Sequence, residues 1–82
     1  MKTNFSTELY IQAHGKSPKG CDGWGFAISS INGYKWPIRK IHYAPTMTLT
    51  EAKRWIKTTI QKEAFDLSFG EKVKSITAEI MP

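Results

Sequence analysis

Two segments of the chain, one near each end, alternate between apolar and polar residues. A period of two is typical of a strand with one buried face, because successive side chains point to opposite faces of a sheet. We therefore predict half-buried strands over residues 7–14 and 72–80. The apolar positions of the pattern are Leu9, Ile11 and Ala13 in the first segment and Ile76, Ala78 and Ile80 in the second.

The dipeptide Asn32-Gly33 separates two runs rich in β-branched and aromatic residues. Both residues tolerate the positive φ of a type I′ turn, so the pattern predicts a hairpin between strands 24–31 and 34–43. Because proline donates no backbone hydrogen bond, Pro37 predicts that the second strand lies at a sheet edge. The register of a two-residue turn pairs Ile31 with Tyr34, Ser29 with Trp36, Ile28 with Pro37 and Phe26 with Arg39.

A helix is predicted to begin at Thr48. Thr48 and Glu51 have the spacing of a capping box, in which each side chain bonds the other residue's backbone N–H. Apolar residues then recur every three or four positions, as on the buried face of a helix. We expect Trp55 to lie in the core and Gly70 to end the segment after the helix. The apolar face comprises Leu49, Ala52, Ile56 and Ile60 with the flanking Trp55, Thr59 and Ala64, and the other face comprises Lys53, Arg54, Lys57 and Gln61.

These elements predict a single α+β domain over residues 1–82, in the order β-β-β-α-β. Three strands in a meander cannot cover their own apolar face, and the helix is available to do so. The helix also provides the crossover that lets the last strand run parallel to the first. We expect a four-stranded mixed sheet of spatial order 3-2-1-4, with one helix packed on one face.

Composition narrows the class of protein. The formal net charge is +5 over 82 residues, and a basic balance favours an anionic partner. The single cysteine, Cys21, excludes an internal disulfide. No apolar run approaches the ~20 residues that span a bilayer, and the polar start of the chain lacks the apolar core of a signal peptide. We therefore expect a cytoplasmic protein without membrane contact.

Both faces of the predicted hairpin are apolar, although a ribbon with one buried face should show one polar face. Three explanations are open: cover by other segments of the chain, self-association, or a binding surface. Self-association through the edge strand would give a homodimer. One face carries Trp24, Phe26, Ile28 and Ile41, and the other carries Ala27, Ile31, Tyr34, Trp36 and Ile38.

Aromatic residues stand next to lysine and arginine on this hairpin. That composition is typical of interface anchors and of base-stacking platforms. If the basic face of the helix continues onto the hairpin, the two form one partner-binding surface. Its predicted residues are Tyr34, Lys35, Trp36, Arg39, Lys40, Lys53, Arg54 and Lys57.

The strand order, the Gly23-Trp24-Gly25 turn after a glycine-rich loop and the acidic Glu51 early in the helix resemble the first half of the ribonuclease H-like fold. The resemblance implies two-metal nuclease chemistry only if several convergent carboxylates are present. Glu51 matches the helix glutamate of that family in type. The first-strand aspartate would fall near Gln12 and the fourth-strand aspartate near Thr77-Ala78, so we expect a truncated domain that lacks the catalytic carboxylates.

The sequence contains no evident acid–base pair, nucleophile arrangement, metal cluster or cofactor loop, and we expect His14 and His42 to be polar residues at strand ends. We therefore predict no catalytic residue, no metal and no cofactor. We expect a non-enzymatic binding module, of the accessory type found in phages and mobile elements, that modulates or inhibits a larger host protein or nucleoprotein complex. The alternatives are direct binding of single-stranded nucleic acid and a degenerate ribonuclease H-like nuclease.

Overall fold

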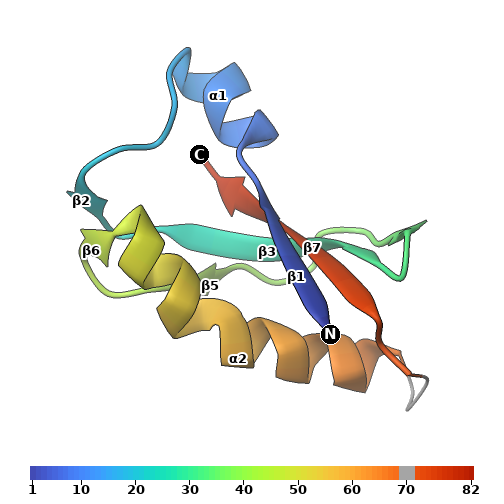
Figure 1. Ribbon diagram of the computed structural model, residues 1–82. Coiled ribbons are helices and arrows are strands. Elements are labelled where there is room, and N and C mark those ends of the chain that lie inside the picture. Colours follow the sequence, from blue (N-terminus) through green and yellow to red (C-terminus); the bar gives the residue numbers. More distant parts are fainter. Residues whose placement is uncertain (69–71) are drawn as a thin grey trace.

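The chain forms two helices and seven strands within residues 1–68 and 72–82, which are the residues that the computed structural model describes. Figure 1 shows the long helix lying along one side of a twisted sheet. The predicted α+β class is confirmed. In chain order the elements are β1 (Lys2–Ser6), α1 (Glu8–His14), β2 (Cys21–Asp22), β3 (Gly25–Ile31), β4 (Tyr34–Lys35), β5 (His42–Tyr43), β6 (Met47–Thr48), α2 (Leu49–Leu67) and β7 (Ser75–Met81).

The last strand, β7, lies inside the main sheet and not at its edge. It pairs in parallel with β1 and antiparallel with β3, while β4 and β5 pair with the other side of β3. The last strand does run parallel to the first strand of the sheet, but that strand is β1 and not the predicted segment 7–14. The predicted four-stranded order 3-2-1-4 is wrong, because the described residues form a five-stranded sheet in which β7 lies between β1 and β3, and a separate two-stranded sheet of β2 and β6. An inner position suits β7, since Ile76, Ala78 and Ile80 are fully buried there.

Residues 7–14, predicted as a strand, form the helix α1 instead. Gly15 ends this helix with a positive φ of 70° and donates its N–H to the carbonyl of Ile11. The alternation of Leu9, Ile11 and Ala13 does not reflect a buried face, because no residue of α1 is fully buried. Tyr10 is the contact with the core, and its ring centroid lies 5.7 Å from that of Trp24. The first strand is β1, in the residues that precede the predicted one.

The hairpin at Asn32-Gly33 is confirmed, and both residues have positive φ. Ile31 pairs with Tyr34, and the Trp36 N–H donates to the Ser29 carbonyl as predicted. The ladder then stops. The predicted pairs of Ile28 with Pro37 and of Phe26 with Arg39 are wrong, because His42 takes the place opposite Phe26. His42 comes three residues later than the register requires, so residues 37–41 loop out from the sheet edge.

A bulge at Ser29 changes which residues of β3 share a face. The pairing with β7 shifts between Ile28 and Ser30, so Ser29 is an extra residue. Such a bulge moves every later residue to the other face. Ile31 therefore joins the buried side, and the expectation of two apolar hairpin faces is wrong. The side that faces α2 gathers Phe26, Ile28 and Ile31, while the opposite side carries small or polar residues such as Asn4, Ala27, Ser30, Thr77 and Glu79.

The helix α2 begins as predicted. Thr48 is its N-cap, and both hydrogen bonds of the capping box with Glu51 are present. Ala52, Ile56, Ile60 and Ala64 are buried against the sheet. Trp55 is not in the core, since 53% of it is exposed; it lies at the flank of the buried row, a quarter-turn from Ile56. The predicted end at Gly70 lies outside the described residues.

Candidate functional site

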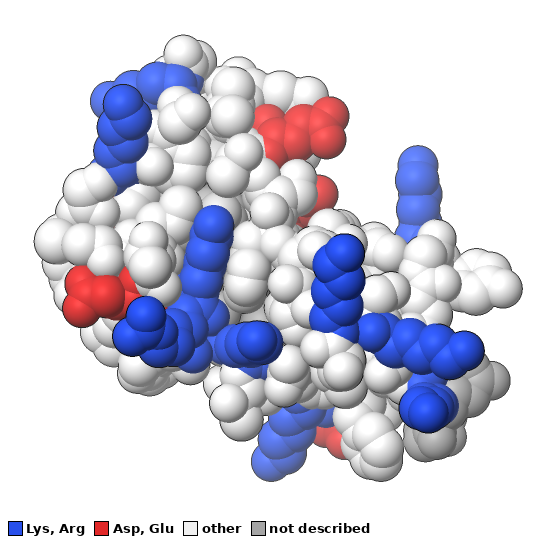
Figure 2. All heavy atoms as spheres, viewed as in Figure 1, with Lys and Arg blue, Asp and Glu red and all other residues white. Residues whose placement is uncertain are grey.

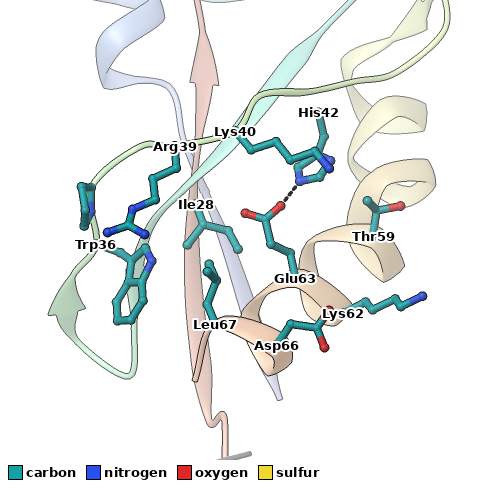
Figure 3. A pocket seen from close by; sticks show the side chains of 11 residues that line it. Ile28, Trp36, Arg39, Lys40, His42, Thr59, Lys62, Glu63, Asp66 and Leu67 are labelled. Atoms are coloured by element: carbon teal, nitrogen blue, oxygen red, sulfur yellow. Dashed lines mark hydrogen bonds and ion pairs between the residues drawn. The ribbon is translucent and has the colours of Figure 1, made fainter. Parts of the chain in front are cut away.

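A pocket of about 370 Å³ lies between the looped-out edge of the sheet and the C-terminal half of α2 (Figure 3). Its lining comes from three parts of the chain: the centre of β3, the segment from residue 36 to residue 42 that ends in β5, and the C-terminal half of α2. Apolar side chains form its inner wall, and charged side chains surround it. The lining residues are Ile28, Trp36, Pro37, Arg39, Lys40, His42, Thr59, Lys62, Glu63, Asp66 and Leu67.

The pocket exists because the edge strand is interrupted. A regular hairpin would continue alongside β3 and leave no space, but residues 37–41 leave the ladder. Pro37 is the first residue of the loop, and its nitrogen carries no hydrogen with which a further strand could pair on the outer side of this edge. Beneath the loop, Ile28 of β3 and Leu67 of α2 face the opening that results. The same residue that predicted an edge therefore also marks where the pocket opens.

One hydrogen-bonded pair joins the two walls. Nε2 of His42 and Oε2 of Glu63 are in contact, which ties β5 to α2 (Figure 3). The two side chains are only 12% and 19% exposed. His42 was expected to be a polar residue at a strand end, and it is the first residue of β5. Its bond to Glu63, which the sequence did not predict, connects this strand to α2.

Trp36 forms part of the pocket wall and also packs against the hydrophobic core. Its indole Nε1 is buried and has no hydrogen-bond partner among the described residues. A buried donor without an acceptor is unusual in a folded protein. In Figure 3 the nitrogen lies on the edge of the ring that faces the interior of the pocket.

The cations of the pocket have no ionic partners. Within residues 1–68 and 72–82 the His42–Glu63 pair is the only ion pair, so Arg39, Lys40 and Lys62 carry unpaired charges. Asp66 is the remaining acidic group of the lining. Figure 2 shows that lysine and arginine side chains are spread over the face of the molecule in view, with few acidic groups between them. The surface around the pocket is therefore able to attract an anionic partner.

Three of the eight predicted site residues, Trp36, Arg39 and Lys40, line this pocket. Tyr34 and Lys35 lie beyond it at the hairpin tip, where Tyr34 is 76% exposed. These five residues all belong to the hairpin or the loop that follows it. The structure thus supports a cluster on this edge of the sheet, although the sequence register for it was partly wrong.

The basic face of α2 does not continue onto the hairpin, which corrects the predicted single surface. Lys53 lies on the side of the helix next to β1, with its Nζ 5.8 Å from the centroid of the Phe5 ring. Lys57 is one helical turn further along the same side, and Gln61 after it bonds Thr3 of β1. The strands β1 and β5 lie at opposite edges of the sheet. Arg54 is exposed, whereas Lys53 is partly buried.

Sequence reasoning missed the helix contribution to the site. Lys62, Glu63 and Asp66 follow Thr59 at spacings of three and four, so they share one side of α2. That spacing could have been recognised in the sequence. The loop at residues 37–41 could not have been predicted, because its shape depends on where β5 returns to the sheet.

The residues expected for metal binding or nuclease chemistry are not grouped in the described part of the chain. The described residues contain no group of three or more His, Cys, Asp or Glu side chains placed to hold a metal ion. Glu51, the match to the ribonuclease H-like helix glutamate, is engaged in the capping box with Thr48. Gln12, near the expected first-strand aspartate, lies on α1 and not on a strand. Cys21 is a free, exposed thiol.

The chain is a small α+β domain with a pocket and several basic side chains at one edge of its main sheet. No family model matches the chain, and no curated protein or solved structure matches it either. Among the described residues, neither helix is long and apolar enough to cross a membrane.

Proposed function

We propose that the protein is a non-enzymatic binding module that attaches to a larger partner through the surface around the pocket and modulates or inhibits that partner. The observation that carries the proposal is the group of unpaired cations, Arg39, Lys40 and Lys62, around an apolar opening. Aromatic and arginine anchors next to a pocket are typical of interfaces. The partner is a host protein or nucleoprotein complex in the cytoplasm, and the protein acts as an accessory factor of the phage or mobile-element type.

A second function is direct binding of single-stranded nucleic acid. The exposed Tyr34 next to Lys35 favours it, because an exposed ring beside a cation can stack on a base while the cation contacts phosphate.

The interrupted edge formed by β4 and β5 also leaves room for a second copy of the chain to pair there, which would make the module a homodimer.

Capture from extracts of the native host, before and after nuclease digestion, separates the two functions. A protein partner should survive digestion and stay bound as salt is raised from about 0.05 M to about 0.2 M, whereas binding to several phosphates weakens steeply over this range. Loss of the captured partner on digestion, with strong salt dependence of direct oligonucleotide binding, would favour the nucleic-acid function.

Matched variants locate the surface. Arg39→Ala and Trp36→Phe should weaken capture, and Lys53→Ala and Lys57→Ala should leave it unchanged, because the helix lysines lie toward the opposite sheet edge. Anchor residues typically cost about 2 kcal/mol or more when truncated, compared with a few tenths for a peripheral lysine. Circular dichroism confirms first that each variant is folded. If the helix variants lose the partner and the others keep it, the proposed surface is wrong.

A further inference from the structure

The lining of the pocket indicates what kind of group it takes, and this inference rests on the proposed function. Ile28, Leu67 and Trp36 make the inner wall apolar. A volume of about 370 Å³ is near the lower end of the range for binding pockets. The space therefore suits a single large side chain better than a folded element.

The charges indicate what surrounds that side chain. Arg39 and Lys40 on the loop and Lys62 on α2 all line the opening. In Figure 3 the Lys62 side chain extends outward from α2, so its charge lies at the rim of the opening. The Glu63 carboxylate already contacts His42. Asp66 is then the one acidic side chain of the lining without a partner. The opening thus has an excess of positive charge around an apolar interior.

Trp36 distinguishes between two classes of occupant. A ring that stacks on a nucleobase must present a free face, as exposed aromatic residues do in proteins that bind single strands. Trp36 is instead half-buried, packs against the core and forms a wall. The aliphatic Ile28 and Leu67 beside it also favour an apolar side chain over a base.

We infer that the pocket binds one large apolar side chain of an acidic peptide segment, with the carboxylates on both sides of that side chain contacting Arg39, Lys40 and Lys62. Binding has two parts. Burial of the side chain against Ile28, Trp36 and Leu67 supplies an apolar contact that salt does not screen. The carboxylates supply the preference for an acidic partner and accelerate association.

Titration of the ¹⁵N-labelled protein with short capped peptides tests the inference. The probe is Asp-Glu-Phe-Asp-Glu, and the controls are Asp-Glu-Gly-Asp-Glu, Lys-Lys-Phe-Lys-Lys and a short oligothymidylate. The indole N–H resonance of Trp36, assigned with Trp36→Phe, reports on the pocket, because its donor is buried in the wall without an acceptor. The phenylalanine probe should shift this resonance in a saturable way, and the three controls should not.

Two charge reversals on α2 provide a matched pair. Lys62→Glu places a carboxylate at the pocket, and Lys57→Glu places one toward β1. Both change the net charge equally, so any difference between them is local. Lys62→Glu should lower the affinity for the phenylalanine probe by about fivefold or more, because an exposed charge contact is lost and its sign reversed. Lys57→Glu should change that affinity by less than about twofold.

The inference is overturned if the probe leaves the Trp36 resonance unmoved up to millimolar concentration, or if both reversals weaken it equally, which would indicate general electrostatic attraction. It is also overturned if oligothymidylate moves the resonance and the peptide does not. In the first case, a partner captured through Arg39 would still support the proposed function, so the two failures are distinguishable.

Discussion

His42 on β5 and Glu63 on α2 are hydrogen-bonded to each other across the pocket, and they connect a two-residue edge strand to the longest helix. Both side chains are mostly buried. A strand as short as β5 has few ladder hydrogen bonds of its own. The contact with Glu63 therefore helps to hold the looped-out edge in the position that opens the pocket.

A double-mutant cycle should detect this connection. His42→Ala and Glu63→Ala should each destabilise the fold, and the double variant should lose less than the sum of the two, with a coupling of about 1–2 kcal/mol. Urea denaturation of the four proteins measures it. Additive losses would show that the two side chains do not support each other.

The helix cap should contribute measurably to stability. Thr48→Ala removes the oxygen that accepts the Glu51 N–H and should cost about 1 kcal/mol. Thr50→Ala is the matched control, since Thr50 is exposed within the first turn and is not the cap. A thermal midpoint that falls equally in both variants, or in neither, would argue against the cap.

Acid should weaken the same end of α2. The hydrogen bonds from the Thr48 side chain and backbone to the carboxylate lower the pKa of Glu51 below its ordinary value. Because the folded-state pKa is depressed, this contribution is present at neutral pH and is lost as the pH falls below about 4.5 through the folded-state value. The stability of Glu51→Gln should therefore fall less between pH 6 and acid pH, by about the contribution lost. Parallel pH profiles of the two proteins would contradict this.

Hydrolysis provides a separate test of Glu51. We expect no cleavage of an RNA–DNA hybrid in the presence of Mg²⁺ or Mn²⁺, and we expect Glu51→Gln to change stability alone. Glu51 is held by the N-cap, and two-metal chemistry needs several convergent carboxylates. Metal-dependent cleavage that disappears in the Glu51→Gln variant would overturn the binding-module proposal in favour of a nuclease.

The turn residue Asn32 should matter for more than its backbone conformation. Its Oδ1 accepts the N–H groups of Lys74 and Ser75, and its Nδ2 donates to the carbonyl of Lys72. These bonds join the hairpin to the start of β7. Asn32→Gly suits the φ of 53° but removes all three, so it should destabilise by about 1–3 kcal/mol in urea denaturation.

Asn32→Asp is the comparison for this prediction. It keeps the acceptor for the two N–H groups and loses the donor, so it should lower the free energy of unfolding by less than Asn32→Gly does. A glycine variant as stable as the original chain would mean that the turn requires only positive φ and that the side-chain bonds contribute nothing.

Local signals in the sequence determined the parts of the fold that depend on neighbouring residues. Asn32-Gly33 specified the turn because few residue types adopt positive φ without strain, and Thr48 with Glu51 specified the helix start. The alternation of Ile76, Ala78 and Ile80 identified a strand on which these three apolar side chains are fully buried. Trp36, Arg39 and Lys40 were recognised as candidates because their residue types suit interfaces wherever they lie.

Tertiary structure alone decided the rest, because those features depend on which distant segments meet. The bulge at Ser29 follows from the pairing of β3 with β7, which no local pattern encodes, and it shifts every face assignment after it. The helix α1 is a second example. Its residues alternate as in a strand, but β1 and not this segment forms the edge strand of the sheet. The pocket exists because the loop before His42 returns to the sheet next to Glu63. A contact between segments so far apart in the chain is determined by the packing of the whole core.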